Sequence, residues 1–168
     1  MLADAIRLLL FPALMAFAAS SDLITMTISN RVSLALAASF FALALMWHMP
    51  LAEIGLHAAA SATVLVVAFV FFARGWIGGG DAKLAAATAL WLGFDQLLNY
   101  LIFASLFGGL LTLAILRFRA VPLPRMLANQ EWAQRLHRMD TGIPYGIALA
   151  LAALMIYPDT PWMKSLGM

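Results

Sequence analysis

The sequence contains no cysteine, only three scattered histidines and few charged residues. Without cysteine, disulfides, thiolate nucleophiles and cysteine metal sites are excluded. The histidines lack the i, i+4 spacing of a helical metal site, so we expect neither a metal nor a cofactor. Charged residues make up 11% of the chain, whereas a typical soluble domain has about 25%. The net charge of +2 is too small to indicate nucleic-acid binding.

Apolar residues are abundant instead and make up 64% of the 168 residues. A soluble chain of this length does not bury so much apolar surface. We therefore predict an all-α integral membrane protein, with residues 1–168 forming one transmembrane domain. A bundle of about six spanning helices is expected. The candidate segments cover residues 7–21, 32–47, 54–73, 81–94, 97–116 and 143–157, with a turn at residues 93–96.

The lysines and arginines predict how these segments are oriented. Eight of the ten basic residues follow the first, third and fifth segments, which places those loops in the cytosol. Only Arg7 and Lys164 remain on the other side, where both termini are then expected. The outer loops carry the acids Glu53, Asp95 and Asp159.

The segment from residue 117 to 142 is the only long connection, and it is basic. Pro122 and Pro124 stop the preceding helix from continuing. Met126, Trp132, Leu136 and Met139 have partly helical spacing, which is consistent with a short helix lying on the membrane surface. A basic loop that only sets the orientation is the alternative. Within this loop, Glu131 and Asp140 have arginines available as partners.

Two acids, Asp22 and Asp81, lie where apolar helices meet the predicted cytosolic face. Ionisable residues at that depth are costly and are candidates for function. If the first and fourth segments are neighbours, the two carboxylates share one proton, and one activates water while the other polarises a peptide carbonyl. The alternatives are structural. Asp81 follows three glycines and has the position of an acid at a helix N-terminus, and Asp22 has Arg31 available as a partner.

Three motifs around these acids resemble those of the type IV prepilin leader peptidases. The segment Gly78-Gly79-Gly80-Asp81-Ala82-Lys83-Leu84 resembles the GxGDxKL signature of that family. Asp22, followed by Ile28-Ser29-Asn30, resembles its other aspartate motif. The segment Pro144-Tyr145-Gly146-Ile147-Ala148 is similar to the P-Y-G-x-A segment that opens the last span. The motifs occur in the order of the family, and the resemblance covers essentially the whole chain.

The resemblance implies an aspartic endopeptidase that removes the leader from prepilins or pseudopilins at the cytosolic face of the bacterial inner membrane. Asp22 and Asp81 are then the catalytic residues, and Gly78 and Gly80 shape the loop before Asp81. Lys83, Asn30 and Pro144 belong to the motifs; for Lys83, a membrane-surface anchor is the alternative. The implied partners are the prepilin substrate, the lipid bilayer and the pilus assembly machinery.

The chain also departs from the larger members of that family, which carry paired CxxC motifs and methylate the new N-terminus. With no cysteine, it resembles the short, peptidase-only form of Flp-type pilus systems, so N-methylation is not expected. Two other functions stay open: a small cation or proton transporter that uses the same aspartates, and a non-catalytic subunit of a pilus or secretion assembly. The lone His57 is expected to form a hydrogen bond between helices and is not placed in the site.

Overall fold

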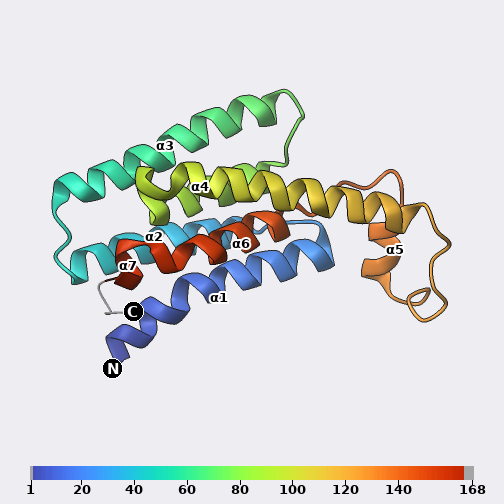
Figure 1. Cartoon of the computed structure of the whole chain (residues 1–168), viewed down its shortest axis with the longest axis horizontal. Coiled ribbons are helices and arrows are strands. Elements are labelled where there is room, and N and C mark those ends of the chain that lie inside the picture. The colour runs from blue at the N-terminus through green and yellow to red at the C-terminus, as the bar shows by residue number, and fades with distance from the viewer. Residues whose placement is uncertain (1, 165–168) are drawn as a thin grey trace.

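The chain folds into seven α-helices and one short 3-10 helix within the part that the structure describes. The structure is a computed structural model that describes residues 2–164, the side chains of residues 2–5 and 7 excepted. The helices are α1 (Leu2–Thr25), α2 (Asn30–Met46), α3 (Leu51–Ala73), α4 (Gly79–Arg119), α5 (Glu131–His137), α6 (Tyr145–Ile156), η1 (Tyr157–Asp159) and α7 (Pro161–Lys164). Consecutive long helices run in alternating directions, so their ends gather at two opposite ends of one bundle (Figure 1).

The prediction of an all-helical fold is confirmed, and the six expected segments fall largely within helices. By length and composition, α1, α3 and α4 are long and apolar enough to cross a membrane, and α2 and α6 are shorter apolar helices. The number of crossings and the side on which the termini lie stay predictions. The side chain of Arg7, which we predicted for the outer side, lies outside the described residues.

Helix α4 turns back on itself at Gly93, near the start of the turn predicted for residues 93–96. Gly93 has φ 64° and ψ −178°, which is not helical and which residues with a side chain rarely adopt. Figure 1 shows the two parts of α4 running in opposite directions. We call residues 79–92 the first arm and residues 94–119 the second arm. The helical hydrogen-bond pattern resumes immediately after Gly93, so the reversal needs no separate loop.

Two side chains from other elements bind the carbonyl groups that this reversal leaves free. The last carbonyls of a helix have no partner within that helix. Nδ1 of the buried His57 lies 2.7 Å from the Leu90 carbonyl oxygen, and Nε1 of Trp162 donates to the Trp91 carbonyl oxygen at 3.2 Å. His57 thus joins α3 to α4, as expected for a lone histidine in a span, and has no place beside Asp22 or Asp81.

An aromatic cluster fixes the end of the bundle opposite the aspartates. Phe11 of α1 lies 5.1 Å from Trp91 of α4 and 4.6 Å from Tyr157, measured between ring centroids. Phe11 and Trp91 precede and follow the aspartates of their helices by about ten residues, which corresponds to roughly 15 Å along each helix axis. The cluster therefore holds α1 and the first arm in a fixed relation without contacting either aspartate.

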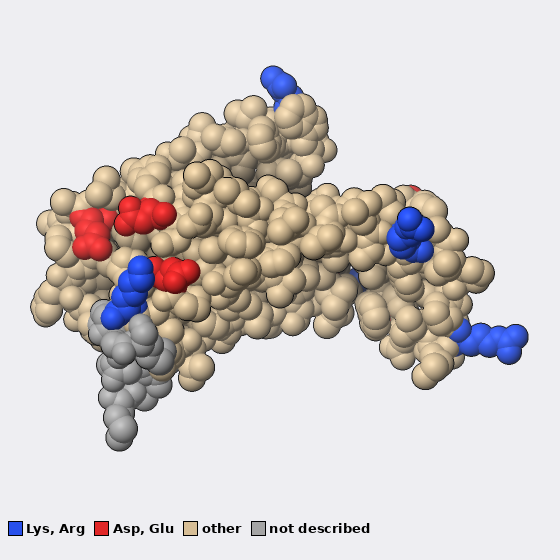
Figure 2. All heavy atoms as spheres, in the orientation of Figure 1, with Lys and Arg blue, Asp and Glu red and all other residues tan. Residues whose placement is uncertain are grey.

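Charged side chains are sorted between the two ends of the bundle. Figure 2 shows acidic side chains gathered at the end near the start of α3, while most basic side chains on this face lie toward the opposite end. This separation agrees with the loop charges from which the orientation was predicted.

Candidate functional site

Asp22 lies near the end of α1 and is buried, with 5% of its surface exposed. One of its carboxylate oxygens, Oδ2, accepts a hydrogen bond from the backbone N–H of Gly146 at 2.7 Å. Gly146 belongs to the first turn of α6, where backbone N–H groups have no partner inside the helix. The contact therefore satisfies a free N–H, places the carboxylate at a helix N-terminus and fixes the end of α1 against α6.

Gly146 is required at this position because of the space it leaves. A Cβ atom there would lie 2.8 Å from Oδ2 of Asp22 and 2.8 Å from Cδ1 of Ile28. Any larger residue would push the carboxylate away from the N–H that binds it. Gly146 lies within the third motif, but only Pro144 of that segment was predicted as a site residue. Pro144 is buried and immediately precedes α6.

The turn after α1 brings the chain back beside Asp22. Met26 has a φ of 55°, and its N–H donates to the Asp22 carbonyl oxygen at 2.8 Å, which ends the helix. The Ser21 hydroxyl donates to the carbonyl oxygen of Thr27 at 3.0 Å and holds the part of the turn that runs back toward Asp22. Ile28 then lies against Gly80, where a Cβ would come within 3.1 Å of the Ile28 Cβ. Gly80 thus permits close packing between this turn and the start of α4.

Asp81 lies in the first turn of α4 and is half-buried. Its carboxylate accepts a hydrogen bond from the backbone N–H of Gly78, the residue that caps the helix. This is half of a capping box, in which an acid at the third helical position reaches back to the capping residue. The structural role considered for Asp81 is therefore present, although it leaves the other carboxylate oxygen available. Asp22 does not have the structural role proposed for it, because it forms no ion pair with Arg31 among the described residues.

The two carboxylates face one cavity of about 260 Å³. Gly78, Gly79 and Gly80 form one wall of this cavity, and residues 26–28 form another. Asp22 and Asp81 are close enough for the charge of one to act on the other. The volume exceeds the roughly 30 Å³ that one water molecule occupies in the liquid. The cavity that both acids line is therefore large enough for a water molecule and a peptide group.

Lys83 and Asn30 come together, but beside the cavity rather than in its lining. Nζ of Lys83 donates to Oδ1 of Asn30 at 2.9 Å, which joins the start of α2 to the start of α4. Lys83 is exposed, so this contact adds only a modest stabilisation. The arrangement favours a structural role for both residues, in which they hold the start of α2, just after the turn that follows Asp22, against the start of α4.

Two arginines that were not selected from the sequence hold the segment 117–142: Arg119 ties its two ends together, and Arg135 joins it to the end of α1. Arg119 is buried, and its guanidinium donates to the carbonyl oxygens of Leu136 at 2.8 Å, Thr141 at 3.1 Å and Gly142 at 2.8 Å. Arg135 of α5 donates to the carbonyl oxygen of Ile24 at 2.6 Å, near the end of α1 and two residues from Asp22.

A short helix, α5, is present within this segment, and it is shorter than the apolar spacing from Met126 to Met139 implied. Its location on the membrane surface stays a prediction. Asp140 pairs with Arg138, as predicted, and this hydrogen bond lowers the pKa of the exposed Asp140. Among the side chains that the structure describes, no three from His, Asp or Glu come together as ligands for a metal ion.

A helical, strongly apolar protein with two carboxylates in one cavity has the pair of acids with which aspartic-type hydrolases cleave a bond. The model of the type IV leader peptidase family matches residues 9–113, and the chain belongs to this family. Membership implies an aspartic-type peptidase activity and confirms the family resemblance; the match covers the two aspartate motifs and not the segment Pro144–Ala148. The matched region contains both aspartates and ends before α5 and α6. Comparisons with curated proteins and with solved structures gave no match.

Proposed function

We propose that this protein is a membrane aspartic endopeptidase that cleaves the N-terminal leader from type IV prepilins or pseudopilins of the Flp type. Cleavage takes place at the cytosolic face of the bacterial inner membrane, and no N-methylation follows. Asp22 and Asp81 are the catalytic pair. Family membership supports the peptidase activity, and the shared cavity of Asp22 and Asp81 is the observation that carries the assignment of the residues.

The proposed reaction needs one protonated and one ionised carboxylate. Two acids that act on each other's charge tend to bind a single proton between them and titrate as a pair. The ionised acid takes a proton from water as its oxygen attacks the scissile carbonyl carbon, while the protonated acid donates to the carbonyl oxygen. The tetrahedral intermediate then collapses. The C–N bond breaks, a proton from the acid that served as base passes to the leaving amine, and one hydroxyl proton of the intermediate returns to the acid that had donated to the carbonyl oxygen, which restores the pair.

The backbone N–H groups of Gly146 and Gly78 prepare the pair for this task. Each binds one carboxylate and restricts its rotation, so the acids are held before substrate arrives. The three glycines next to Asp81 carry no side chains into the cavity, which leaves space for an extended substrate segment to approach.

An aspartate-based transporter fits the structure less well. Such a protein needs a polar route from the aspartates to the other face of the membrane. Beyond the aspartates, the interior is filled by the buried rings of Phe11, Phe40 and Trp91. These packed rings favour a site that opens toward one end of the bundle only.

The deciding experiment is cleavage of a reconstituted Flp-type prepilin by the wild-type protein and by Asp22→Asn and Asp81→Asn. Both variants keep the size of the side chain and remove the acid. We expect each to lower the cleavage rate by about a hundredfold or more, the usual contribution of a general acid or base. Mass spectrometry of the pilin identifies the cut and shows an unmethylated new N-terminus.

Asp140→Asn is the matched control, because Asp140 is an exposed acid that does not line the cavity. It should cleave at the wild-type rate. If Asp22→Asn or Asp81→Asn also processed the pilin normally while remaining inserted and folded, the assignment of the catalytic pair would be wrong. A non-catalytic assembly subunit would give no cleavage with any of the four proteins.

A further inference from the structure

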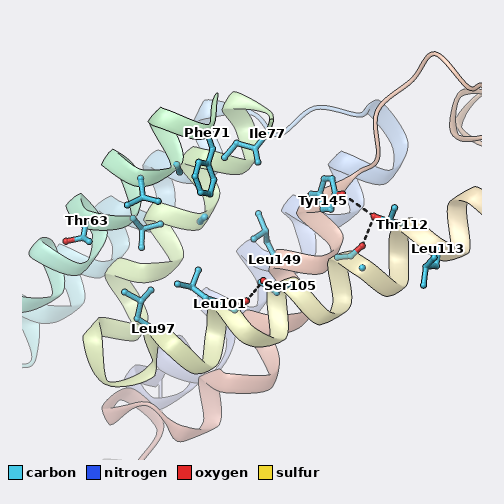
Figure 3. A pocket seen from close by; sticks show the side chains of 17 residues that line it. Thr63, Phe71, Ile77, Leu97, Leu101, Ser105, Thr112, Leu113, Tyr145 and Leu149 are labelled. Carbon is cyan, nitrogen blue, oxygen red and sulfur yellow. Dashed lines mark hydrogen bonds between the residues drawn. The ribbon is translucent and has the colours of Figure 1, made fainter. Parts of the chain in front are cut away.

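A long apolar groove lies between α3, the second arm of α4 and α6. Its volume is about 700 Å³, and the 17 residues that line it include no charged side chain. Figure 3 shows the groove from close by, with Phe71 on the α3 side and Leu101 and Leu113 along the second arm. This groove is separate from the cavity that holds the aspartates.

The polar groups in the groove already have partners within the protein. The Ser105 hydroxyl donates to the Leu101 carbonyl oxygen at 2.7 Å, and the Thr112 hydroxyl donates to the Gly108 carbonyl oxygen at 2.8 Å. Thr112 also lies 3.1 Å from the Tyr145 hydroxyl. Nothing polar is therefore left to attract a polar ligand, and the surface suits an apolar one.

Small residues along the second arm leave room for another backbone to come close. Gly108 packs against Tyr145, whereas a Cβ added at Gly109 would meet no atom within 4 Å. Close approach at small residues is how helices associate inside membranes, where no hydrophobic effect drives them together. A helix is thus a suitable occupant for this groove.

One end of the groove lies beside the candidate catalytic cavity. Ile77 lines the groove and is followed directly by Gly78, which lines the cavity. Tyr145 also lines the groove and is followed by Gly146, the residue that binds Asp22. In Figure 3, Ile77 and Tyr145 lie toward the same side of the groove, away from Leu97. An occupant extending along the groove therefore ends beside the aspartates.

We infer that this groove holds the apolar helix that follows the scissile bond in the substrate. The inference rests on the proposed peptidase function and adds to it the place where the substrate is bound. From Leu97 to Leu113 the second arm advances about 24 Å, which is most of the roughly 30 Å thickness of a bilayer core. A lipid is a weaker candidate, because no cationic side chain lines the groove to bind its headgroup phosphate.

The test is to fill the groove from within by Gly109→Leu. Gly109 is exposed and an added Cβ there meets no atom within 4 Å, so the substitution should leave the fold and the aspartates undisturbed. Gly55→Leu is the matched control, since Gly55 is also helical with open space around it but does not line the groove. Each protein is given an intact prepilin and, separately, a peptide that contains the cleavage site without the apolar helix.

With the intact prepilin, kcat/KM of Gly109→Leu should fall about tenfold or more, since displacing one large apolar side chain from its seat is worth at least that factor. Gly55→Leu should match wild type, and all three proteins should cleave the short peptide equally. A photo-crosslinking residue at Leu113 should capture the prepilin.

Equal cleavage of the intact prepilin by both glycine variants, or crosslinks to lipid or to a second copy of the chain alone, would overturn the inference while leaving the peptidase function intact. If the wild type cleaves no prepilin, the proposed function fails together with it.

Discussion

The hydrogen bond between Gly146 and Asp22 gives the sharpest test of how the site is built. In Gly146→Ala, the added Cβ would lie 2.8 Å from Oδ2 of Asp22 and 3.1 Å from the Asp22 Cβ. The carboxylate oxygen is the end of a rotatable side chain, so it can turn away at little cost to the fold. When it turns, it loses the N–H that binds it at 2.7 Å.

The size of the effect follows from the kind of bond that is lost. A hydrogen bond to a charged group contributes about 1.5–3 kcal/mol. If this bond holds Asp22 in its reactive position, that energy appears in the barrier, where each 1.36 kcal/mol is tenfold in rate. We therefore expect kcat/KM for prepilin cleavage to fall about 10- to 150-fold.

The assay is cleavage of prepilin in proteoliposomes, followed by mass spectrometry, together with thermal unfolding of each protein in detergent. Gly55→Ala is the control, because Gly55 is a helical glycine with no atom within 4 Å of its added Cβ. It should keep full activity. Cleavage by Gly146→Ala within about twofold of wild type would refute the claim that this N–H positions Asp22 for the reaction, since that corresponds to less than 0.5 kcal/mol.

Two further predictions concern contacts that hold the fold around the site. Gly93→Ala should lower the free energy of unfolding by about 1–3 kcal/mol, because φ is positive at this residue and the new Cβ would lie 3.0 Å from the His57 ring. A thermal shift assay measures the change. An unchanged melting temperature would show that the chain reverses without strain at this residue. Arg119→Met should leave the carbonyl oxygens of Leu136 and Gly142 without their donor and lower the free energy of unfolding by about 1–3 kcal/mol. Because the segment 117–142 is then held less firmly, trypsin should cleave faster after Arg125. Equal proteolysis of wild type and variant would contradict the anchoring role of Arg119.

The sequence was sufficient for those features that depend on local composition. Apolar stretches about as long as a bilayer is thick predicted the helices, because such runs have no other stable environment. Prolines and glycines indicated where helices end, and the reversal falls at Gly93 because the glycine tolerates a positive φ. The depth of Asp22 and Asp81 in apolar helices marked them as costly residues that required an explanation.

The tertiary structure was needed wherever a partner lies far away in the chain. Gly146 is 124 residues from Asp22, and no local pattern indicates that its N–H faces that carboxylate. The contact of Lys83 with Asn30 and that of His57 with Leu90 likewise depend on how the helices pack. The groove beside the second arm has no sequence signal at all, because its apolar residues look like those of any spanning helix.

By itself, then, the sequence determined that this is an apolar helical protein with two aspartates at helix ends on one side. Hydrophobicity and backbone preference act over short distances along the chain and can be read from it. Only the tertiary structure decided that the two aspartates share a cavity, and that an apolar groove lies beside it. Those facts depend on helix packing, which is set by the combined fit of side chains such as Phe11, Trp91 and Tyr157 from separate elements.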